Sequence, residues 1–454
     1  MLFSSPVFLF WFLPLALLVY WMTPERARNA ILVLLSYVFY SWWDPLLVPL
    51  LLASTCLNYG IGRFLSAAVA HRRGWWLAIG VILNVLLLGF FKYEAMLART
   101  LLALTGQSIV PVLSIPLPLG ISFFTFEGIS YLVDVYRGGK ASKRFTEFTC
   151  FISFFPHLIA GPIIRFGEIA PQFQHHLNGW SEHAEGIYRF LLGLGKKVIL
   201  ANLFGSVADA AFASTSLSSA SAWAGLIAYS MQIYLDFSAY TDMAIGLGLL
   251  FGFRLPENFD RPYSARSVTE FWRRWHMTLS RWIRDYIYIP LGGSRGSTLF
   301  TIRNLLITMT IAGAWHGASW TFVAWGVYHG ILLSVERIGT VKNMSIVPDQ
   351  LKTPITFLLV TLGWVLFRAE SFGAALQYYR ALIPTTLLDI TADLTAGMPA
   401  ILVVAFGFLA LERFIPKLPQ RFTFPLTVLM TCVLLCSFFV AFGSTGTPFI
   451  YFQF

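Results

Sequence analysis

Three histidines lie in otherwise apolar sequence, each flanked by glycine, proline or tryptophan. They are His316 in AGAWHGASW, His276 in FWRRWHMTLSRW and His157 in FFPHLIAGP. A buried histidine needs a hydrogen-bond partner, and a neutral imidazole can take a proton from a hydroxyl group where a charged base would be too costly to desolvate. These side chains are therefore candidates for general acid–base chemistry.

The surroundings of His316 allow two interpretations. It can be a helix-packing histidine that bonds to a neighbouring carbonyl, or it can be the base of a buried site. Small neighbours favour the second, because backbone or a slender substrate can then approach the ring, and two tryptophans can form pocket walls. These neighbours are Gly313, Ala314, Gly317 and Ala318, with Trp315 and Trp320. We expect no metal site, because no two histidines stand four residues apart on one helix.

Arginine alternates with tryptophan and tyrosine in the segment 270–296. One explanation is an aromatic belt with basic anchors at the membrane edge. The other is an entrance that attracts a phosphate-bearing donor from the cytoplasm. The arginines that would bind its phosphates are Arg273, Arg274, Arg281 and Arg284. Glu270 and Asp285 could equally pair with these arginines internally, so the sequence leaves both explanations open.

The apolar block from Trp223 to Phe253 contains two acids, Asp236 and Asp242. A carboxylate in a membrane segment is costly enough to face a partner or a cavity rather than lipid. Together with the interrupted run around Pro156 to Pro162, these acids suggest a secondary transporter as an alternative class. Inverted repeats would be expected in a transporter, and none is visible. The sequence lacks a GxxxxGK[ST] phosphate-binding loop. It has one GxSxG match, GGSRG at 292–296, but this lies in a chain of predicted helices without the strand-to-helix turn on which a serine nucleophile sits.

The composition excludes a soluble globule. Of 454 residues, 57% are hydrophobic and only 12% are charged, whereas about 25% are charged in soluble proteins. The formal charge of +10 is typical of basic loops on the cytoplasmic side of a membrane protein, and we expect no nucleic-acid partner. The N-terminus has no basic residue before its apolar run and no cleavage site after it, so we expect it to remain as the first helix.

The hydropathy pattern predicts an all-α polytopic membrane protein with about eleven or twelve transmembrane helices. The expected spans are 7–21, 30–43, 46–61, 75–91, 119–135, 223–253, 305–320, 321–334, 355–367, 400–411 and 426–441. Alternate loops between the first spans are basic, which places them in the cytoplasm and the N-terminus in the periplasm.

Two segments depart from this pattern. The run 148–166 contains Pro156, Gly161 and Pro162, which predict a broken or re-entrant element, because irregular backbone at membrane depth must be buried in protein or line a cavity. The run 186–203 is amphipathic and predicts a helix along the cytoplasmic interface. We expect one domain over 1–454, made of N-terminal helices 1–136, a catalytic core 137–345 with the basic segment 254–303, and C-terminal helices 346–454.

Several motifs together resemble the membrane-bound O-acyltransferase family. They are AWHGASWTFVAWGVYHG, NFDRPYSARSVTEFWRRWHMTLSRWIRDYIYIPLGG, QIYLDFSAYTDMAIGLGLLFGFRLPENF, FFPHLIAGPI and the closing FIYFQF. The bacterial alginate O-acetylation branch is the most similar part of the family, and the resemblance covers most of the chain from Leu119 onward together with residues 1–40. Members of that branch acylate exopolysaccharides such as alginate or cellulose, and a related group moves D-alanine to teichoic acids.

The resemblance implies roles for particular residues. His316 corresponds to the active-site histidine of the family, and His276 to its second recurrent histidine. The implied donor-binding residues are Arg273, Arg274, Arg281, Trp272 and Trp275. The motif residues without a settled role are Asn258, Asp236, His157 and His329, of which His329 is expected to be structural.

The implied activity is O-acetyl transfer in the bacterial inner membrane. Acetyl-CoA is the expected donor, no cofactor is expected to be bound, and a periplasmic acetyltransferase or acyl-accepting protein is the expected partner, beside membrane lipid. His316 would act as general base, while His276 or a backbone amide would stabilise the oxyanion. An acyl or D-alanyl carrier protein as donor remains an alternative.

Overall fold

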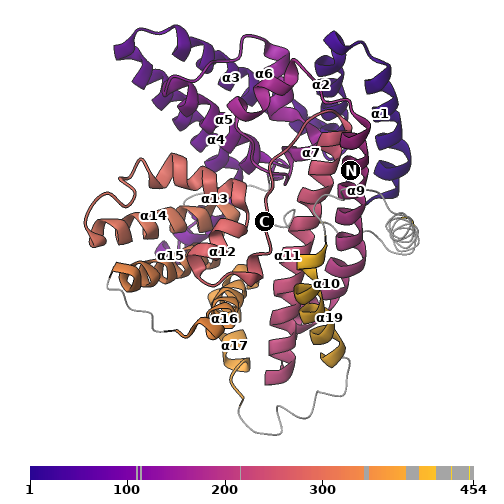
Figure 1. The fold of residues 1–454 in the computed structure, drawn as a ribbon. Helices are drawn as coiled ribbons and strands as arrows, with labels where there is room; N and C mark the ends of the chain where they lie inside the picture. Colours follow the sequence, from indigo (N-terminus) through magenta and orange to yellow (C-terminus); the bar gives the residue numbers. More distant parts are fainter. Residues whose placement is uncertain are drawn as a thin grey trace. The chain divides into compact units, whose positions relative to one another are not determined.

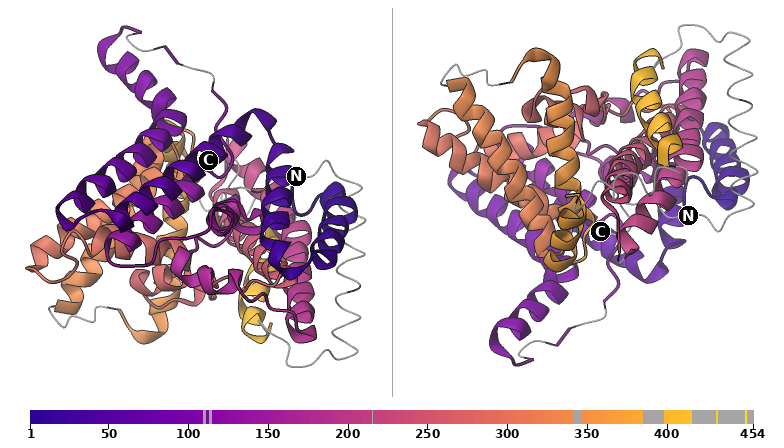
Figure 2. Two further views of the ribbon diagram at one scale, coloured as in Figure 1. Left: turned by 90° about the horizontal axis from the view of Figure 1, so that it is seen from above. Right: turned by 90° about the horizontal axis from the view of Figure 1, so that it is seen from below.

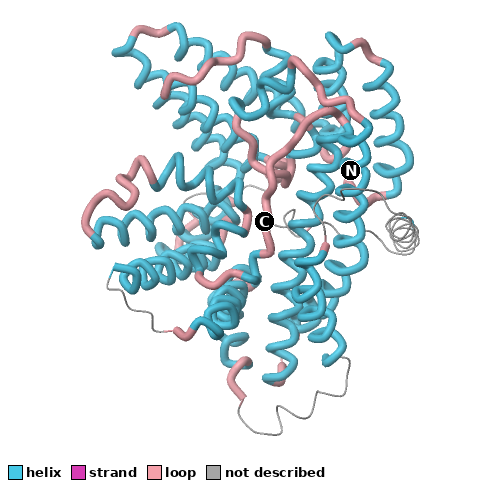
Figure 3. Tube along the Cα trace, in the orientation of Figure 1, coloured by secondary structure: helices cyan, strands magenta, loops and turns pink. Residues whose placement is uncertain are grey.

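The structure is a computed structural model that describes residues 1–108, 111–112, 115–214, 216–341, 347–384 and 398–415, together with Thr431 and Phe449. These residues form helices joined by loops, and no strand occurs among them (Figure 3). The predicted all-α class is therefore confirmed. The expected span 426–441 lies outside the described residues, apart from Thr431.

The chain divides into two compact units. Residues 1–194 and 240–256 make up most of the first, and residues 195–239 and 257–424 make up most of the second. The long helix α11 contributes to both (Figure 1). The three-part division of a single domain stays a prediction.

The first unit is built from the N-terminal helices. They are η1 (Phe8–Phe12), α1 (Leu13–Met22), α2 (Glu25–Ser41), η2 (Pro45–Leu47), α3 (Val48–Ala67), α4 (Ala70–Thr105), α5 (Ile121–Tyr136), α6 (Phe145–Ser153), α7 (Phe155–Leu158), α8 (Phe166–Ile169), η3 (Ala170–Phe173) and α9 (Trp180–Gly195). The 36-residue α4, coloured purple in Figure 2, exposes many apolar side chains, as expected for a lipid-facing helix.

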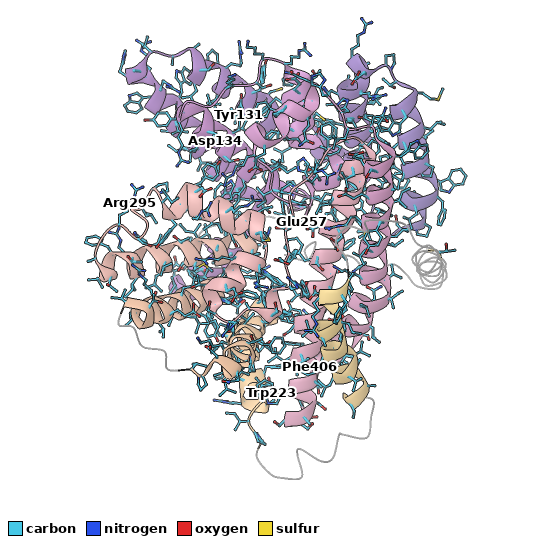
Figure 4. All side chains as sticks on the ribbon, in the orientation of Figure 1. Tyr131, Asp134, Trp223, Glu257, Arg295 and Phe406 are labelled. Atoms are coloured by element: carbon cyan, nitrogen blue, oxygen red, sulfur yellow. The ribbon has the colours of Figure 1, made fainter. Side chains whose placement is uncertain are left out.

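Helix packing in the first unit depends on small and paired polar residues. Tyr131 of α5 (Figure 4) packs so closely on Gly62 that a Cβ at Gly62 would lie 2.4 Å from its ring. Asn58 of α3 and Asn84 of α4 are both buried, and their side-chain amides donate hydrogen bonds to each other at 3.2 and 2.8 Å. Buried amides inside a membrane helix bundle are satisfied in this way by a partner on the next helix.

The predicted break near residue 156 is confirmed. α6 ends at Ser153, the single turn α7 follows, and the backbone is not helical again until α8. Residues 154–164 are buried, which agrees with the rule that irregular backbone at this depth is enclosed by protein. At Gly161 an added Cβ would lie 2.3 Å from Cα of His157, so only glycine fits this turn.

The helices of the second unit follow α9. They are η4 (Lys196–Ala201), α10 (Asn202–Ala213), α11 (Ser219–Leu250), η5 (Pro262–Ser264), α12 (Val268–Arg274), α13 (Met277–Ile283), η6 (Arg284–Tyr288), α14 (Thr298–His316), α15 (Trp320–Val341), α16 (Asp349–Arg368), α17 (Phe372–Ala381), α19 (Met398–Leu411) and η7 (Glu412–Phe414). Within the described residues, four helical runs are long and apolar enough to cross a membrane: Pro45–Ala67, Ala70–Thr105, Trp180–Ala213 and Asp349–Arg368.

The amphipathic run 186–203 lies inside the continuous 34-residue helical run Trp180–Ala213, and its position along the cytoplasmic interface stays a prediction. Two of its basic residues pair with buried acids. Arg189 lies 2.6 Å from Asp242 within the first unit, and Lys197 lies 2.6 Å from Asp236 within the second. The expectation that both acids face a partner is confirmed by the same ion pairs.

Candidate active site

A close helix pair carries His316. Helices α14 and α15 lie side by side (Figures 1 and 2) and are joined by the three residues 317–319. A Cβ at Gly313 would lie 2.3 Å from the carbonyl oxygen of Phe322, and one at Gly326 would lie 2.3 Å from that of Met309. These glycines therefore let the two backbones touch. The small residues near His316 serve backbone approach, as the sequence suggested.

His316 is the last residue of α14 and is only 4% exposed. Its ring is enclosed by aromatic side chains. Trp325 meets it edge-to-face with 5.2 Å between ring centroids, Phe367 of α16 lies at 5.2 Å, and Trp315 lies at 5.0 Å. Trp320, the other expected wall, is 49% exposed. The imidazole thus lies in a largely apolar environment.

His276 lies in the turn between α12 and α13, and its ring centroid is 6.4 Å from that of His316. Its backbone has φ of 41°, a left-handed conformation that is uncommon for residues other than glycine and often marks a functional site. The ring is completely buried and packs against Phe237. Two histidines that are forty residues apart in the chain are therefore neighbours in the fold.

Asn258 fixes the protonation of His276. The side-chain oxygen Oδ1 of Asn258 accepts from the backbone N–H of Thr278 at 3.2 Å, which establishes that this atom is an acceptor. Nδ1 of His276 lies 3.1 Å from the same oxygen, so it must be the donor. Burial lowers the pKa of His276 to about 3, so the ring is neutral at pH 7 and Nε2 holds a lone pair.

His329 is the opposite tautomer to His276. The indole N–H of Trp272 donates to Nδ1 of His329 at 3.3 Å. Because an indole nitrogen is only a donor, Nδ1 of His329 is an acceptor and the proton of the neutral ring is on Nε2. His329 is completely buried on α15, one turn after Trp325.

Glu336 at the other end of α15 anchors the short helix α12. Its carboxylate accepts from the backbone N–H groups of Val268 and Thr269 at 2.5 and 2.9 Å, and from the Thr269 hydroxyl at 2.7 Å. A negative charge at a helix N-terminus satisfies free N–H groups and the helix dipole. Glu336 therefore fixes the helix that leads to His276.

The structure separates paired from unpaired arginines in the basic segment. Arg274 lies 2.6 Å from Glu270, and Arg284 lies 2.6 Å from Asp285. Glu270 also accepts a hydrogen bond from the backbone N–H of Arg266. Partial burial raises the pKa of Glu270, but this hydrogen bond and the Arg274 guanidinium have the larger combined effect, so the pKa of Glu270 is lowered. Glu270 and Asp285 are therefore internal partners of Arg274 and Arg284, a possibility that the sequence left open.

Arg273, Arg281 and Arg295 have no ion-pair partner within the part of the chain that the structure describes. Arg273 is exposed and Arg281 is half-buried, while Arg295 lies on the loop between η6 and α14 (Figure 4). Arg273 and Arg281 are therefore the expected donor-binding arginines that keep their charge available for an anion.

The other expected donor-binding residues are not at the surface. Trp272 is 9% exposed and bonds to His329, and Trp275 is 1% exposed and packs on Trp364. These two tryptophans hold α12 against α15 and α16. The expected motif residue His157 belongs to the first unit, where its Nδ1 lies 3.1 Å from Oε1 of the buried Glu127. It therefore fastens the broken element to α5.

Three residues of this site were not predicted from the sequence. Trp325 and Phe367 enclose His316, and Glu336 anchors α12. The only available signal was the spacing of Trp325 and His329, which places both on one face of a helix. Neither Phe367 nor Glu336 stands out by type or spacing. Among the described residues, no group of three or more His, Cys, Asp or Glu side chains could hold a metal ion.

Comparisons with known proteins identify the relatives of this chain. Residues 141–342 match the model of the membrane-bound O-acyltransferase family. The chain is 46% identical to the probable alginate O-acetylase of Azotobacter vinelandii over 420 residues, which cover 90% of this chain and 84% of that protein.

Two further relatives extend the comparison. A probable alginate O-acetylase of Pseudomonas putida is 41% identical with both chains covered in full. The peptidoglycan O-acetyltransferase of Helicobacter pylori is 40% identical over 84% of this chain and 80% of its own length. The matched family model includes His276, His316 and their neighbours. This chain belongs to the membrane-bound O-acyltransferase family and is a multi-pass membrane O-acyltransferase.

Proposed function

We propose that the protein transfers an acetyl group from acetyl-CoA to a hydroxyl group, as a step in the O-acetylation of an extracytoplasmic polysaccharide. The observation that carries this proposal is the pair His276 and His316, buried among aromatic rings with 6.4 Å between their centroids. A neutral imidazole in a dry environment can deprotonate a hydroxyl group while water, which would hydrolyse a thioester, is kept away.

In the proposed reaction, His316 takes the proton of the acceptor hydroxyl as its oxygen attacks the thioester carbonyl. The carbon–oxygen bond forms and the carbonyl electrons move onto oxygen. Collapse of this intermediate breaks the carbon–sulfur bond, and the leaving thiolate takes the proton back from His316. The acyl group thus ends as an ester and CoA leaves as a thiol.

The role expected for His276 changes in this scheme. A group that stabilises an oxyanion must donate a hydrogen bond, and Nε2 of His276 holds a lone pair because Nδ1 donates to Asn258. Because the single proton of the attacking hydroxyl goes to His316, we assign Nε2 of His276 an accepting role toward a second hydroxyl of the acceptor, which would position the acceptor for attack. The oxyanion then needs other donors.

The donor phosphates are assigned to Arg273 and Arg281. Neither has an ion-pair partner among the described residues, whereas Arg274 and Arg284 are paired with acids. A guanidinium without an internal partner can bind a phosphate with a charge-assisted hydrogen bond. The excess of arginine in this segment supports a cytoplasmic position, with the N-terminus in the periplasm and the protein in the bacterial inner membrane.

The relatives named as alginate O-acetylases and a peptidoglycan O-acetyltransferase support a polysaccharide as the final acceptor. We propose an exopolysaccharide such as alginate or cellulose, acetylated through a periplasmic acetyltransferase that receives the acetyl group. The transporter alternative loses its support, because Asp236 and Asp242 pair with Lys197 and Arg189.

Release of free CoA from acetyl-CoA tests this proposal. Purified protein in nanodiscs is supplied with acetyl-CoA, with and without the candidate periplasmic partner, and wild type is compared with His316→Ala. We expect partner-stimulated release that the substitution abolishes. Release from an acylated carrier protein but not from acetyl-CoA would overturn the assignment of the donor.

A further inference from the structure

Two buried N–H groups on α15, one of them beside His316, have no acceptor in the part of the chain that the structure describes. They are Nε1 of Trp325 and Nε2 of His329. Nε2 of His329 carries the ring proton because Nδ1 accepts from Trp272, so both atoms are donors. Each side chain is 0% exposed.

Leaving a buried donor without an acceptor costs stability, because the group loses its hydrogen bond to water. Native proteins therefore keep few such groups, and those that persist have a water, a ligand or a catalytic role. Two unsatisfied donors on one face of α15, separated by one helical turn, are more informative than one. Each is a donor that an oxygen atom of a bound molecule can satisfy.

One donor is close to the proposed base, and the second donor is close to the first. The Trp325 ring lies 5.2 Å from that of His316 and 4.9 Å from that of His329, measured between centroids. Gly363 of α16 lies beside Nε2 of His329, where a Cβ would come within 3.2 Å of this nitrogen. A larger residue at position 363 would therefore crowd the N–H group.

We propose that Nε1–H of Trp325 and Nε2–H of His329 bind the acyl oxygen of the donor and stabilise the oxyanion that forms when the acceptor hydroxyl attacks. This assignment rests on the proposed acyl transfer at His316. In the balanced step, the carbonyl electron pair moves onto this oxygen and returns to the carbon as the carbon–sulfur bond breaks. The two N–H groups keep their protons throughout. Fixed donors in a dry site are effective because they need no reorganisation during the reaction.

Trp325→Phe tests the first donor, and Trp364→Phe is the matched control. Trp364 stacks on Trp325 with 5.8 Å between centroids, but its indole N–H already donates to the Tyr263 hydroxyl at 3.1 Å. We expect Trp325→Phe to lower kcat for acetyl transfer roughly 100-fold, with little change in KM for acetyl-CoA, and Trp364→Phe to lower it much less. Equal losses of kcat in the two variants would overturn the assignment.

Two substitutions of His329 by amide side chains separate the roles of its two ring nitrogens. His329→Gln places an amide N–H near the position of Nε2, whereas His329→Asn places an amide oxygen near the position of Nδ1 and provides no group at Nε2. We expect His329→Gln to retain much more kcat than His329→Asn. The opposite order would mean that only the contact with Trp272 matters and would contradict the proposal.

A vibrational measurement separates failure of this inference from failure of the proposed function. Acetyl-CoA with an isotopically labelled carbonyl carbon is bound to His316→Ala, which cannot complete the transfer, and its carbonyl stretch is recorded. We expect a frequency below that of the free thioester, which returns toward the free value when Trp325→Phe is added. If acetyl-CoA binds but its carbonyl frequency is the same with and without Trp325→Phe, the assignment of the two N–H donors is overturned and the proposed function stands. If acetyl-CoA does not bind, the proposed function is overturned as well.

Discussion

Nδ1 of His276 lies 3.1 Å from the side-chain oxygen of Asn258, and this contact decides which nitrogen of the imidazole carries the proton. The same oxygen accepts from the backbone and the hydroxyl of Thr278 at 3.2 and 2.9 Å. The orientation of the amide is thereby fixed. One buried asparagine therefore sets the tautomer of a histidine that is eighteen residues away.

Replacing Asn258 by aspartate changes the charge at this contact while keeping an oxygen acceptor. The carboxylate stabilises the imidazolium and so raises the pKa of His276, which burial holds near 3 in the wild type. Because the proposed role needs a neutral ring, the acid limb of the pH–rate profile should move to higher pH. The measurement is kcat against pH for Asn258→Asp, with Thr278→Val as the control. Superimposable profiles for Asn258→Asp and wild type would contradict the role of this pair.

Arg273→Gln and Arg281→Gln should weaken donor binding. A charge-assisted hydrogen bond contributes about 1.5–3 kcal/mol, and partial exposure reduces this, so we expect KM for acetyl-CoA to rise about five- to tenfold with kcat nearly unchanged. Arg284→Gln is the matched control, because Arg284 is paired with Asp285. KM is measured at two salt concentrations. An equal effect of all three substitutions would argue against a specific phosphate contact.

Gly326→Ala should push α14 and α15 apart, since the added Cβ would lie 2.3 Å from the carbonyl oxygen of Met309. A shift of about 1 Å at a reacting group can lower the rate about 100-fold, and we expect a loss of this size together with a lower Tm. Gly89→Ala on α4 is the control, because no atom lies within 4 Å of its Cβ position. Wild-type activity and Tm in Gly326→Ala would show that close helix contact does not position His316.

The buried pair Lys197 and Asp236 gives a stability prediction. Removing one partner leaves a buried charge and typically costs about 3–5 kcal/mol, so Asp236→Asn should lower Tm markedly. The double variant Lys197→Met/Asp236→Leu removes both charges and should recover most of that loss. Thermal unfolding in detergent measures both. A double variant less stable than Asp236→Asn would indicate that the two side chains do not act as a pair.

The features that could be predicted from the sequence are those that depend on local pattern. Apolar periodicity predicted the helices, Pro156 and Gly161 predicted the broken element, and the small residues around His316 predicted the close approach of backbone. The apolar setting of Asp236 and Asp242 predicted that each has a partner, and the structure identifies these partners as Lys197 and Arg189.

The features that could not be predicted depend on distant elements. Trp325 and Phe367 enclose His316 only because α14, α15 and α16 pack together, and no spacing in the chain encodes that contact. An amphipathic pattern such as that of residues 186–203 is the same whether the polar face of the helix meets water or buried acids, so it did not predict the ion pairs of this helix. The tautomers of His276 and His329 likewise follow from partners on other segments.

Acetyl transfer by His316→Ala tests the central claim most directly. The variant and wild type are purified in nanodiscs, equal Tm values establish that both are folded, and transfer of the labelled acetyl group from acetyl-CoA to the acceptor partner is measured. General base catalysis typically contributes about 10²- to 10⁴-fold to a rate, so we expect transfer to fall by at least the lower of these factors. Transfer at the wild-type rate by the folded variant would contradict the assignment of His316 as the base.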